Sequence, residues 1–285
     1  MIPWLRKRKT SSPSLGPVVI YHHIAKTGGT SLRKVVQANY KGKALWESYG
    51  PNRGSVAWYE AHYHALSPER KAAIQCIAGH SAHYIIPAID RPFRVFTLLR
   101  DPVERMISLY YFAQTLARRG QGKGAEIGRA LQARGWTLAD IYTQLGGGQR
   151  LAPEERRLFA PFFNGQTRAI LGPHTDTSAM PFLPGDSEAL EPMLRQTRQV
   201  LDAYYELGVT EAYAESVQHF ARVFGWRRVF LSHVNRTRKR PRVHELPPRI
   251  LAMIREYNAL DHALHAYAAQ RLAQHQADEL REVDG

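Results

Sequence analysis

The sequence predicts an α/β protein whose central parallel β-sheet is flanked by helices, and two patterns lead to this prediction. Short apolar runs with the composition of buried strands lie at 17–22, 74–78, 94–99, 204–209 and 228–232. Segments with helical periodicity lie between or after them, at 30–40, 102–118, 187–202, 211–224 and 248–273. Strands that alternate with helices favour a parallel sheet covered on both faces.

The length and composition favour one main core. The chain has 285 residues, of which 44% are hydrophobic, and this suffices for a single large domain. We expect this domain at 17–275, with a helical insert at about 119–170 between glycine-rich breaks. A flexible basic tail at 1–16 and a frayed C-terminus at 276–285 complete the expected organisation.

The first predicted strand leads into the run H-I-A-K-T-G-G-T-S-L at 23–32, and a helix is expected to follow. Backbone N–H groups at the start of a helix lack partners within the helix, and the helix dipole favours an anion there. A standard P-loop has its lysine after the glycines, whereas here the lysine comes first. A simple glycine turn is the alternative interpretation. The expected phosphate ligands are Lys26, Thr27, Gly28, Gly29, Thr30 and Ser31.

The third predicted strand leads into R-D-P-V-E-R-M-I-S at 100–108. Asp101 can cap a helix that begins at Pro102, and Glu104 lies where a capping box places its acidic residue. Arg100 then lies at the carboxyl end of a strand, with Ser108 about two helical turns further on the same face. These two residues predict a second phosphate site, and an ordinary capped helix with a surface arginine is the alternative.

The two segments together resemble the nucleotide-binding segments of the carbohydrate sulfotransferases. The closest branch contains the heparan sulfate 2-O-sulfotransferases and bacterial relatives, which usually have proline where this chain has Ala25. Weaker similarity continues through 164–168, 206–211 and 258–261, so the resemblance covers about residues 17 to 272. It implies a P-loop-like sulfotransferase fold and the donor 3′-phosphoadenosine 5′-phosphosulfate, with adenosine 3′,5′-bisphosphate as product.

The resemblance also implies roles for individual residues. Lys26 would lie beside the breaking sulfate–phosphate bond, while Arg100 and Ser108 would hold the 3′-phosphate. His80 matches the G-H dipeptide that supplies the catalytic base in the family, and His83 and His23 are the competing candidates.

A basic run at 236–242 is a flap over the adenine and the 3′-phosphate, a contact for an acidic glycan, or a solvated surface loop. Its first residues, Arg236 and Thr237, loosely match a late nucleotide-binding loop of the family and are therefore candidate donor contacts. Arg33, Lys34 and Arg105 are either further anion contacts or ordinary charges. No histidine pair has the spacing of a zinc site, so we expect no metal.

The net charge of +14 suits an anionic partner without identifying it. We find no nucleic-acid-binding module, and we expect the acceptor to be a glycan, for example an acidic one, or another hydroxyl compound. Cys76 is the only cysteine, and the sequence has neither an apolar run of spanning length nor a signal-peptide core. A bacterial-type cytoplasmic enzyme is therefore expected, with weak membrane contact through the basic N-terminus as an alternative. The rival functions are a P-loop-type nucleotide kinase and a non-catalytic polyanion-binding protein.

Overall fold

The computed structural model describes residues 16–49, 55–120, 124–146, 151–172, 182–185, 187–231 and 240–284. The chain separates into two compact units. Unit 1 comprises residues 1–99, 199–235 and 268–285, and unit 2 comprises residues 100–198 and 236–267. Unit 1 contains the sheet, whereas the described part of unit 2 is helical. The expectation of one domain over 17–275 stays a prediction.

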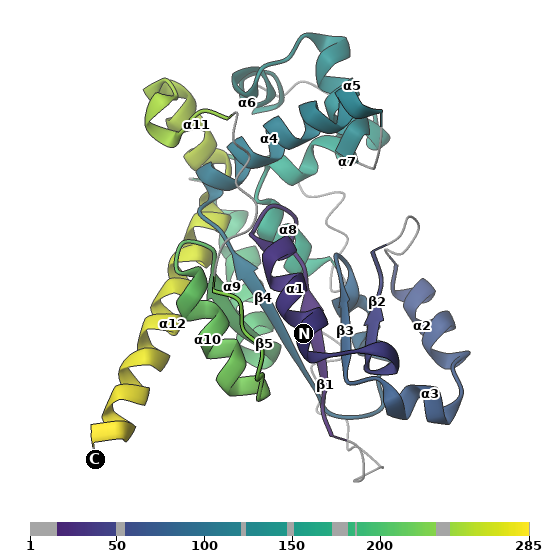
Figure 1. Ribbon diagram of the computed structural model, residues 1–285. Coiled ribbons are helices and arrows are strands. Elements are labelled where there is room, and N and C mark those ends of the chain that lie inside the picture. The colour runs from purple at the N-terminus through teal and green to yellow at the C-terminus, as the bar shows by residue number, and fades with distance from the viewer. Residues whose placement is uncertain are drawn as a thin grey trace. The chain divides into compact units, whose positions relative to one another are not determined.

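Unit 1 is built on a five-stranded sheet with the order β2-β3-β1-β4-β5, in which every neighbouring pair is parallel (Figure 1). The strands are β1 (Val18–His22), β2 (Leu45–Glu47), β3 (Cys76–Gly79), β4 (Phe93–Leu99) and β5 (Tyr205–Val209). The central strand is β1, and its last residue, His22, pairs with Gly79, the last residue of β3. The carboxyl ends of β1 and β3 therefore meet at one edge, and the predicted α/β class is confirmed.

One predicted strand is wrong. Residues 228–231 of the predicted strand at 228–232 are not in a strand, and residue 232 lies outside the described residues. Val229, Phe230 and Leu231 are 37%, 49% and 42% exposed, so this apolar run is not buried as a core strand would be. The fifth strand is instead β2, which has three half-buried residues and therefore lacks the apolar signature of the others.

Helices cover the sheet of unit 1. On one face, α1 (Gly29–Asn39) and α10 (Tyr213–Phe224) pack against alternate residues of β1, β3 and β4. The 3₁₀ helix Ala82–Ala88 contacts β1 on the other face, where the rings of His83 and His22 stack with centroids 3.6 Å apart. The crossover from β2 to β3 contains α2 (Val56–His64) and α3 (Pro68–Ala73).

Unit 2 has a separate hydrophobic core, formed mostly by side chains of its helices. Its helices are α4 (Pro102–Arg119), α5 (Gly124–Arg134), α6 (Leu138–Gly146), α7 (Pro153–Phe159), α8 (Gly165–Leu171) and α11 (Pro248–Tyr257). Two further helices, α9 (Leu190–Tyr204) and α12 (Ala259–Asp284), contribute residues to both units. The Asp101 carboxylate caps α4 by accepting from the Glu104 N–H at 2.9 Å, as the sequence predicts.

The segment 248–273, predicted as one helix, forms parts of two helices, because the helical conformation is interrupted at Asn258. The buried Asn258 side chain donates to the carbonyl of Phe162 at 3.1 Å and accepts from the N–H of Asn164 at 2.9 Å. Asparagine tolerates this break because its side chain replaces backbone hydrogen bonds. The long helical periodicity hides the break, which depends on partners far away in the sequence.

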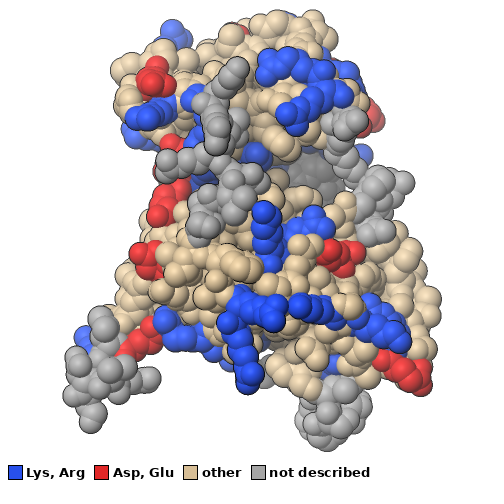
Figure 2. All heavy atoms as spheres, in the orientation of Figure 1, with Lys and Arg blue, Asp and Glu red and all other residues tan. Residues whose placement is uncertain are grey.

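The surface agrees with the strongly basic composition. Lys and Arg side chains lie across much of the face drawn in Figure 2, with fewer Asp and Glu side chains among them. Across the described residues, no helix combines the length and the apolar character that crossing a membrane requires.

Candidate active site

The loop between β1 and α1 forms a tight turn at the carboxyl end of the central strand. Lys26 has φ 71° and Gly28 has φ 82°, so two residues of this loop adopt the left-handed conformation. The Thr27 hydroxyl donates to the carbonyl of Ile24 at 2.9 Å and closes the turn. This arrangement has the strand–turn–helix order of a P-loop-like fold, although the lysine precedes the glycines.

The two adjacent glycines serve different purposes. Gly28 is the residue before α1, and its left-handed backbone is costly for any residue with a Cβ. Gly29 has an ordinary helical backbone, but a Cβ there would overlap the imidazole of His23. The Tyr21 hydroxyl also donates to the carbonyl of Gly29 at 3.2 Å. Gly28 is therefore required for the turn and Gly29 for the close approach of the His23 ring.

The predicted loop ligands differ in exposure. Thr27 is 1% exposed and Ser31 is 3% exposed, whereas Thr30 is exposed and Lys26 is half-buried. The N–H groups of Gly29 and Thr30 precede the first hydrogen bonds of α1, in which the N–H groups of Ser31 and Leu32 donate to the carbonyl of Gly28, so the helix supplies them with no partner. Backbone N–H groups, Lys26 and Thr30 can thus face an anion, whereas the Thr27 hydroxyl is engaged in the turn and Ser31 is buried.

Thr210 fastens this loop to the sheet. It follows β5 directly, and its hydroxyl lies 2.7 Å from the carbonyl oxygen of Thr27 and 3.0 Å from that of Leu99. The Thr210 N–H also donates to Leu99 at 2.8 Å. One buried side chain therefore joins the loop after β1 to the last residue of β4. Thr210 lies in the weakly similar segment 206–211, and no local pattern predicts a role for it.

His80 lies beside the loop, directly after β3. Its Nδ1 is 2.6 Å from the carbonyl oxygen of His23, which can only accept, so Nδ1 carries the proton. In the neutral ring Nε2 then holds the lone pair that can take a proton from a substrate. His80 is exposed, yet the rings of His23 and Tyr49 lie 4.4 and 5.4 Å away. Lost hydration lowers the pKa of His80, and the charge of Arg33 lowers it further against the effect of the His23 hydrogen bond.

The competing histidines have different surroundings. His23 is 9% exposed, and its Nδ1 lies 3.2 Å from the Tyr49 hydroxyl. Burial first, and then the neighbouring His80, hold the pKa of His23 well below its ordinary value, so its ring stays neutral. His83 is 1% exposed and stacks on His22. Of the three candidate bases, His80 is therefore the one at the surface.

Arg33 completes the surroundings of His80. Its Nε donates to the Glu47 carboxylate at 2.7 Å, and its guanidinium lies 4.1 Å from the centre of the Tyr49 ring. These contacts fix one positive charge beside the loop. Lys34, the other candidate on α1, is exposed.

In unit 2, Arg100 begins the second predicted anion segment. Its backbone N–H and carbonyl both bond the Gln166 side-chain amide, each at 2.9 Å. Its guanidinium pairs with the Glu104 carboxylate at 2.9 Å, and Arg240 binds the same carboxylate at 2.6 Å. The expected capping box is therefore only half formed: Asp101 caps the helix, but two arginines engage Glu104.

The remaining candidates on α4 are buried. Ser108 is 4% exposed, and its predicted role stays a prediction. Arg105 is 2% exposed and donates to the carbonyl of Pro161 at 3.1 Å. Burial lowers the pKa of Arg105, and Asp261 opposes that shift. Arg105 is thus part of the interior of unit 2, not a surface anion contact. Arg236 and Thr237 lie outside the described residues.

Two segments that the sequence links only weakly are joined within unit 2. The Asp261 carboxylate accepts from the N–H groups of Gln166 and Thr167 at 2.9 and 2.8 Å, at the start of α8. The Asn164 side chain accepts from the N–H groups of Leu260 and Asp261 at 3.0 and 3.2 Å. This reciprocal network fixes Gln166, which in turn holds the backbone of Arg100.

The chain matches no protein-family model and no curated protein. Among solved structures it is similar to the crystal structure of a sulfotransferase from Alicyclobacillus acidocaldarius. The similarity has a TM-score of 0.40 and 14% sequence identity, and covers 88% of this chain and 94% of that chain. A likeness this low assigns neither an activity nor a role to any residue.

Proposed function

We propose that this protein is a sulfotransferase that uses 3′-phosphoadenosine 5′-phosphosulfate and transfers the sulfuryl group to a hydroxyl of a carbohydrate. One observation carries the proposal. The loop of Lys26 to Ser31 offers N–H groups and a lysine to an anion, and the His23 carbonyl that precedes it orients the imidazole of His80. The loop and the His80 imidazole are thus neighbours, which supports an anion-binding loop beside a base, and the loop lacks the Gly-Lys-Ser/Thr order of a nucleotide kinase.

In this proposal the loop binds the 5′-phosphosulfate and Arg100 with Ser108 binds the 3′-phosphate. Arg100 directly follows Leu99, and Leu99 accepts a hydrogen bond from the same Thr210 hydroxyl that reaches Thr27. Leu99, the last residue of β4, therefore lies near the loop. A nucleotide phosphorylated at both its 5′ and 3′ positions would use both segments, whereas ATP offers no 3′-phosphate.

The reaction follows from these roles. The acceptor hydroxyl oxygen attacks sulfur in line, the bond from sulfur to the bridging phosphate oxygen breaks, and adenosine 3′,5′-bisphosphate leaves. Nε2 of His80 takes the hydroxyl proton. Lys26 and the N–H groups at the start of α1 stabilise the charge that develops on the leaving phosphate oxygen. The chemistry assigned to these residues does not call for a metal ion.

The resemblance to the heparan sulfate 2-O-sulfotransferases adds the carbohydrate acceptor to this proposal. A basic surface suits an acidic glycan, although a lipid-linked sugar fits the same chemistry. The proposed setting is the bacterial cytoplasm, with nucleic acid excluded as a partner. Contact of the basic N-terminus with a membrane remains compatible with this proposal.

Calorimetric titration without metal tests the donor. We expect adenosine 3′,5′-bisphosphate to bind more tightly than AMP or ATP, because only the bisphosphate reaches both segments. Absent binding, or equal binding of all three nucleotides, would overturn the proposal. ATP binding that requires magnesium would favour the kinase. Salt-dependent binding of heparin without bisphosphate binding would favour the polyanion-binding protein.

Transfer of labelled sulfate from the donor to a panel of acidic and neutral glycans then tests the acceptor. His80→Ala is the matched control, because it should bind the bisphosphate and transfer nothing. Transfer that is equal in the variant and the parent would remove His80 from the mechanism.

A further inference from the structure

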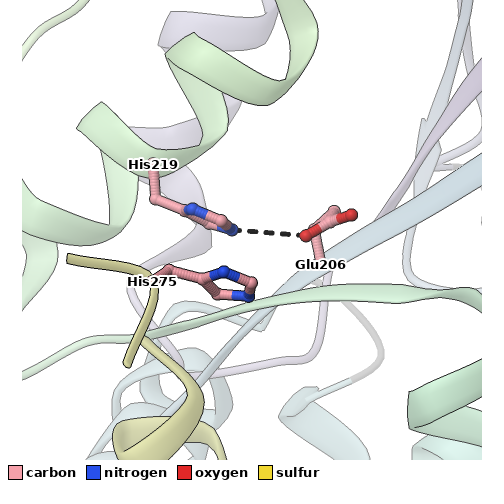
Figure 3. Close-up of side chains that lie close together, drawn as sticks. All are labelled: Glu206, His219 and His275. Atoms are coloured by element: carbon pink, nitrogen blue, oxygen red, sulfur yellow. Dashed lines mark hydrogen bonds and ion pairs between the residues drawn. The ribbon is translucent and has the colours of Figure 1, made fainter. Parts of the chain in front are cut away.

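Three side chains of unit 1 converge away from the loop. Glu206 on β5, His219 on α10 and His275 on α12 each present one ligand atom, and these atoms all lie within 4.8 Å of one another (Figure 3). Nε2 of His219 lies 3.3 Å from Oε2 of Glu206. His219 is 3% exposed, while Glu206 and His275 are half-buried.

We propose that Glu206, His219 and His275 form a binding site for a divalent transition-metal ion of the zinc type, with water as the fourth ligand. Zinc–ligand distances of about 2.0–2.1 Å place tetrahedral ligands about 3.4 Å apart. The 3.3 Å separation of His219 and Glu206 already has this length. Ligand atoms that lie farther apart, within the 4.8 Å span of the cluster, would approach by rotation of a half-buried side chain.

The chemistry of the three groups suits such an ion. The two imidazoles stack with centroids 4.8 Å apart and planes at 21°, an arrangement that disfavours two charged rings. Metal ligands must be deprotonated, and two neutral imidazoles with one carboxylate favour zinc-like ions over magnesium or calcium.

The charged side chains around this site affect how tightly it can bind a cation. Nη1 of Arg94 is 3.8 Å from the other oxygen of Glu206, and Arg271 acts on His275 while pairing with Asp202 at 3.3 Å. Glu279 opposes these cations near His275 and pairs with Arg222. A bound cation would therefore compete with Arg94 for Glu206, so its affinity depends on the two histidines.

The position keeps this ion away from the loop. Glu206 is the second residue of β5, whereas Thr210 follows the opposite end of that strand and contacts the loop. The four residue steps from Glu206 to Thr210 span about 13 Å in an extended strand. The ion would join β5 to α10 and α12, which are distant in sequence. This proposal revises the sequence expectation of no metal, which rested on histidines close together in the chain.

Cobalt titration of the metal-stripped full-length protein tests the site, since tetrahedral Co²⁺ gives intense visible absorption bands. We expect one equivalent to bind with these bands, zinc to displace it, and magnesium and calcium to leave the spectrum unchanged. His275→Gln should weaken binding at least about tenfold. Zinc should also raise the thermal unfolding midpoint of the parent protein but not that of this variant.

Two controls keep the result specific. His62→Gln and His64→Gln remove exposed histidines of α2 and should leave the cobalt spectrum and affinity unchanged. Glu206→Gln keeps the shape of the side chain and should weaken binding without unfolding the protein, as circular dichroism would check. A six-coordinate cobalt spectrum, or equal affinity in the parent and His275→Gln, would overturn the proposal. Bisphosphate binding is scored separately, so this result does not depend on the proposed activity.

Discussion

The loop of unit 1 and the Arg100 segment of unit 2 would bind anions by different means. Backbone geometry fixes the loop: Gly28 turns left-handed, Thr210 holds the carbonyl of Thr27, and His23 orients His80 through its carbonyl. Charged side chains govern the Arg100 segment, where Arg100 and Arg240 share Glu104. We therefore expect substitutions of Lys26 or His80 to lower mainly kcat, and substitutions in the Arg100 segment to change mainly the affinity for the donor nucleotide.

Replacing His80 should give the largest effect. His80→Ala removes the proton acceptor and should lower kcat by about 10²–10⁴-fold. The affinity for adenosine 3′,5′-bisphosphate should stay within about twofold, because the base touches the acceptor and not the donor. Steady-state kinetics and calorimetry on the same preparation measure the two quantities. A large loss of bisphosphate affinity would place His80 in donor binding instead.

The pH profile gives a second readout of His80. The pKa of His80 lies below its ordinary value, and only the neutral ring accepts a proton. Activity should therefore persist as pH falls through about 6.5 and be lost only below that, at the lowered pKa. Loss of activity on acidification that begins above the ordinary histidine pKa would contradict the lowered pKa of His80.

Lys26 should come next in size. Lys26→Gly removes the charge beside the leaving oxygen and should lower kcat by about 10²–10³-fold. Because Lys26 has φ 71°, glycine should also relieve backbone strain, so stability to urea should be unchanged or higher. Lys26→Ala is the matched control, with the same lost charge but the strain retained. Equal rates in either variant and the parent protein would contradict the role of the lysine.

The elements of unit 1 that the sequence predicts correctly are those with local signals. Apolar runs identify β1, β3, β4 and β5, and glycines mark the loop. β2 lacks such a run because its three residues are half-buried. The break at Asn258 is hidden for another reason, since it depends on Phe162 and Asn164. Long-range contacts of this kind leave no periodicity to find.

The residues of the candidate site also divide into those with a local sequence signal and those that depend on contacts between distant segments. The sequence places Lys26 and His80 at strand ends, but residue type does not tell that Thr27 and Ser31 are buried while Thr30 is exposed. Thr210 escapes prediction because its partners are far away in the sequence, Thr27 in the loop after β1 and Leu99 at the end of β4. Functional residues that belong to one local motif can therefore be predicted from the sequence. Hydrogen bonds between segments that follow different strands cannot.

Arg100→Ala tests the affinity side of the comparison. A hydrogen bond to a charged group contributes about 1.5–3 kcal/mol, so the affinity for adenosine 3′,5′-bisphosphate should fall by about 10–100-fold. AMP lacks the 3′-phosphate, and its affinity should be unchanged. Calorimetry with both nucleotides measures the difference. An equal loss for AMP would show that Arg100 supports the fold or the 5′ end instead.

Thr210→Val tests how the loop is held. Removing the hydroxyl leaves the carbonyls of Thr27 and Leu99 without that donor and should lower the free energy of unfolding by about 1–3 kcal/mol. Thr197→Val is the matched control: Thr197 is also buried, but its hydroxyl donates to Met193 within a helix. Urea denaturation should show a clearly smaller loss there. Equal losses would mean that Thr210 has no special role in the loop.

Glu104→Gln should give the smallest change, and in the opposite direction. The carboxylate competes with a 3′-phosphate for Arg100 in a half-buried ion pair, and ion pairs near the surface contribute about 0.2–1 kcal/mol. Its removal should therefore tighten bisphosphate binding by about two- to fivefold while leaving AMP unaffected. Calorimetry at low and high salt measures the gain, which should shrink as salt screens the charges. Weaker binding would instead show that Glu104 orients Arg100 for the phosphate, so that the second segment, like the loop, works by fixed geometry.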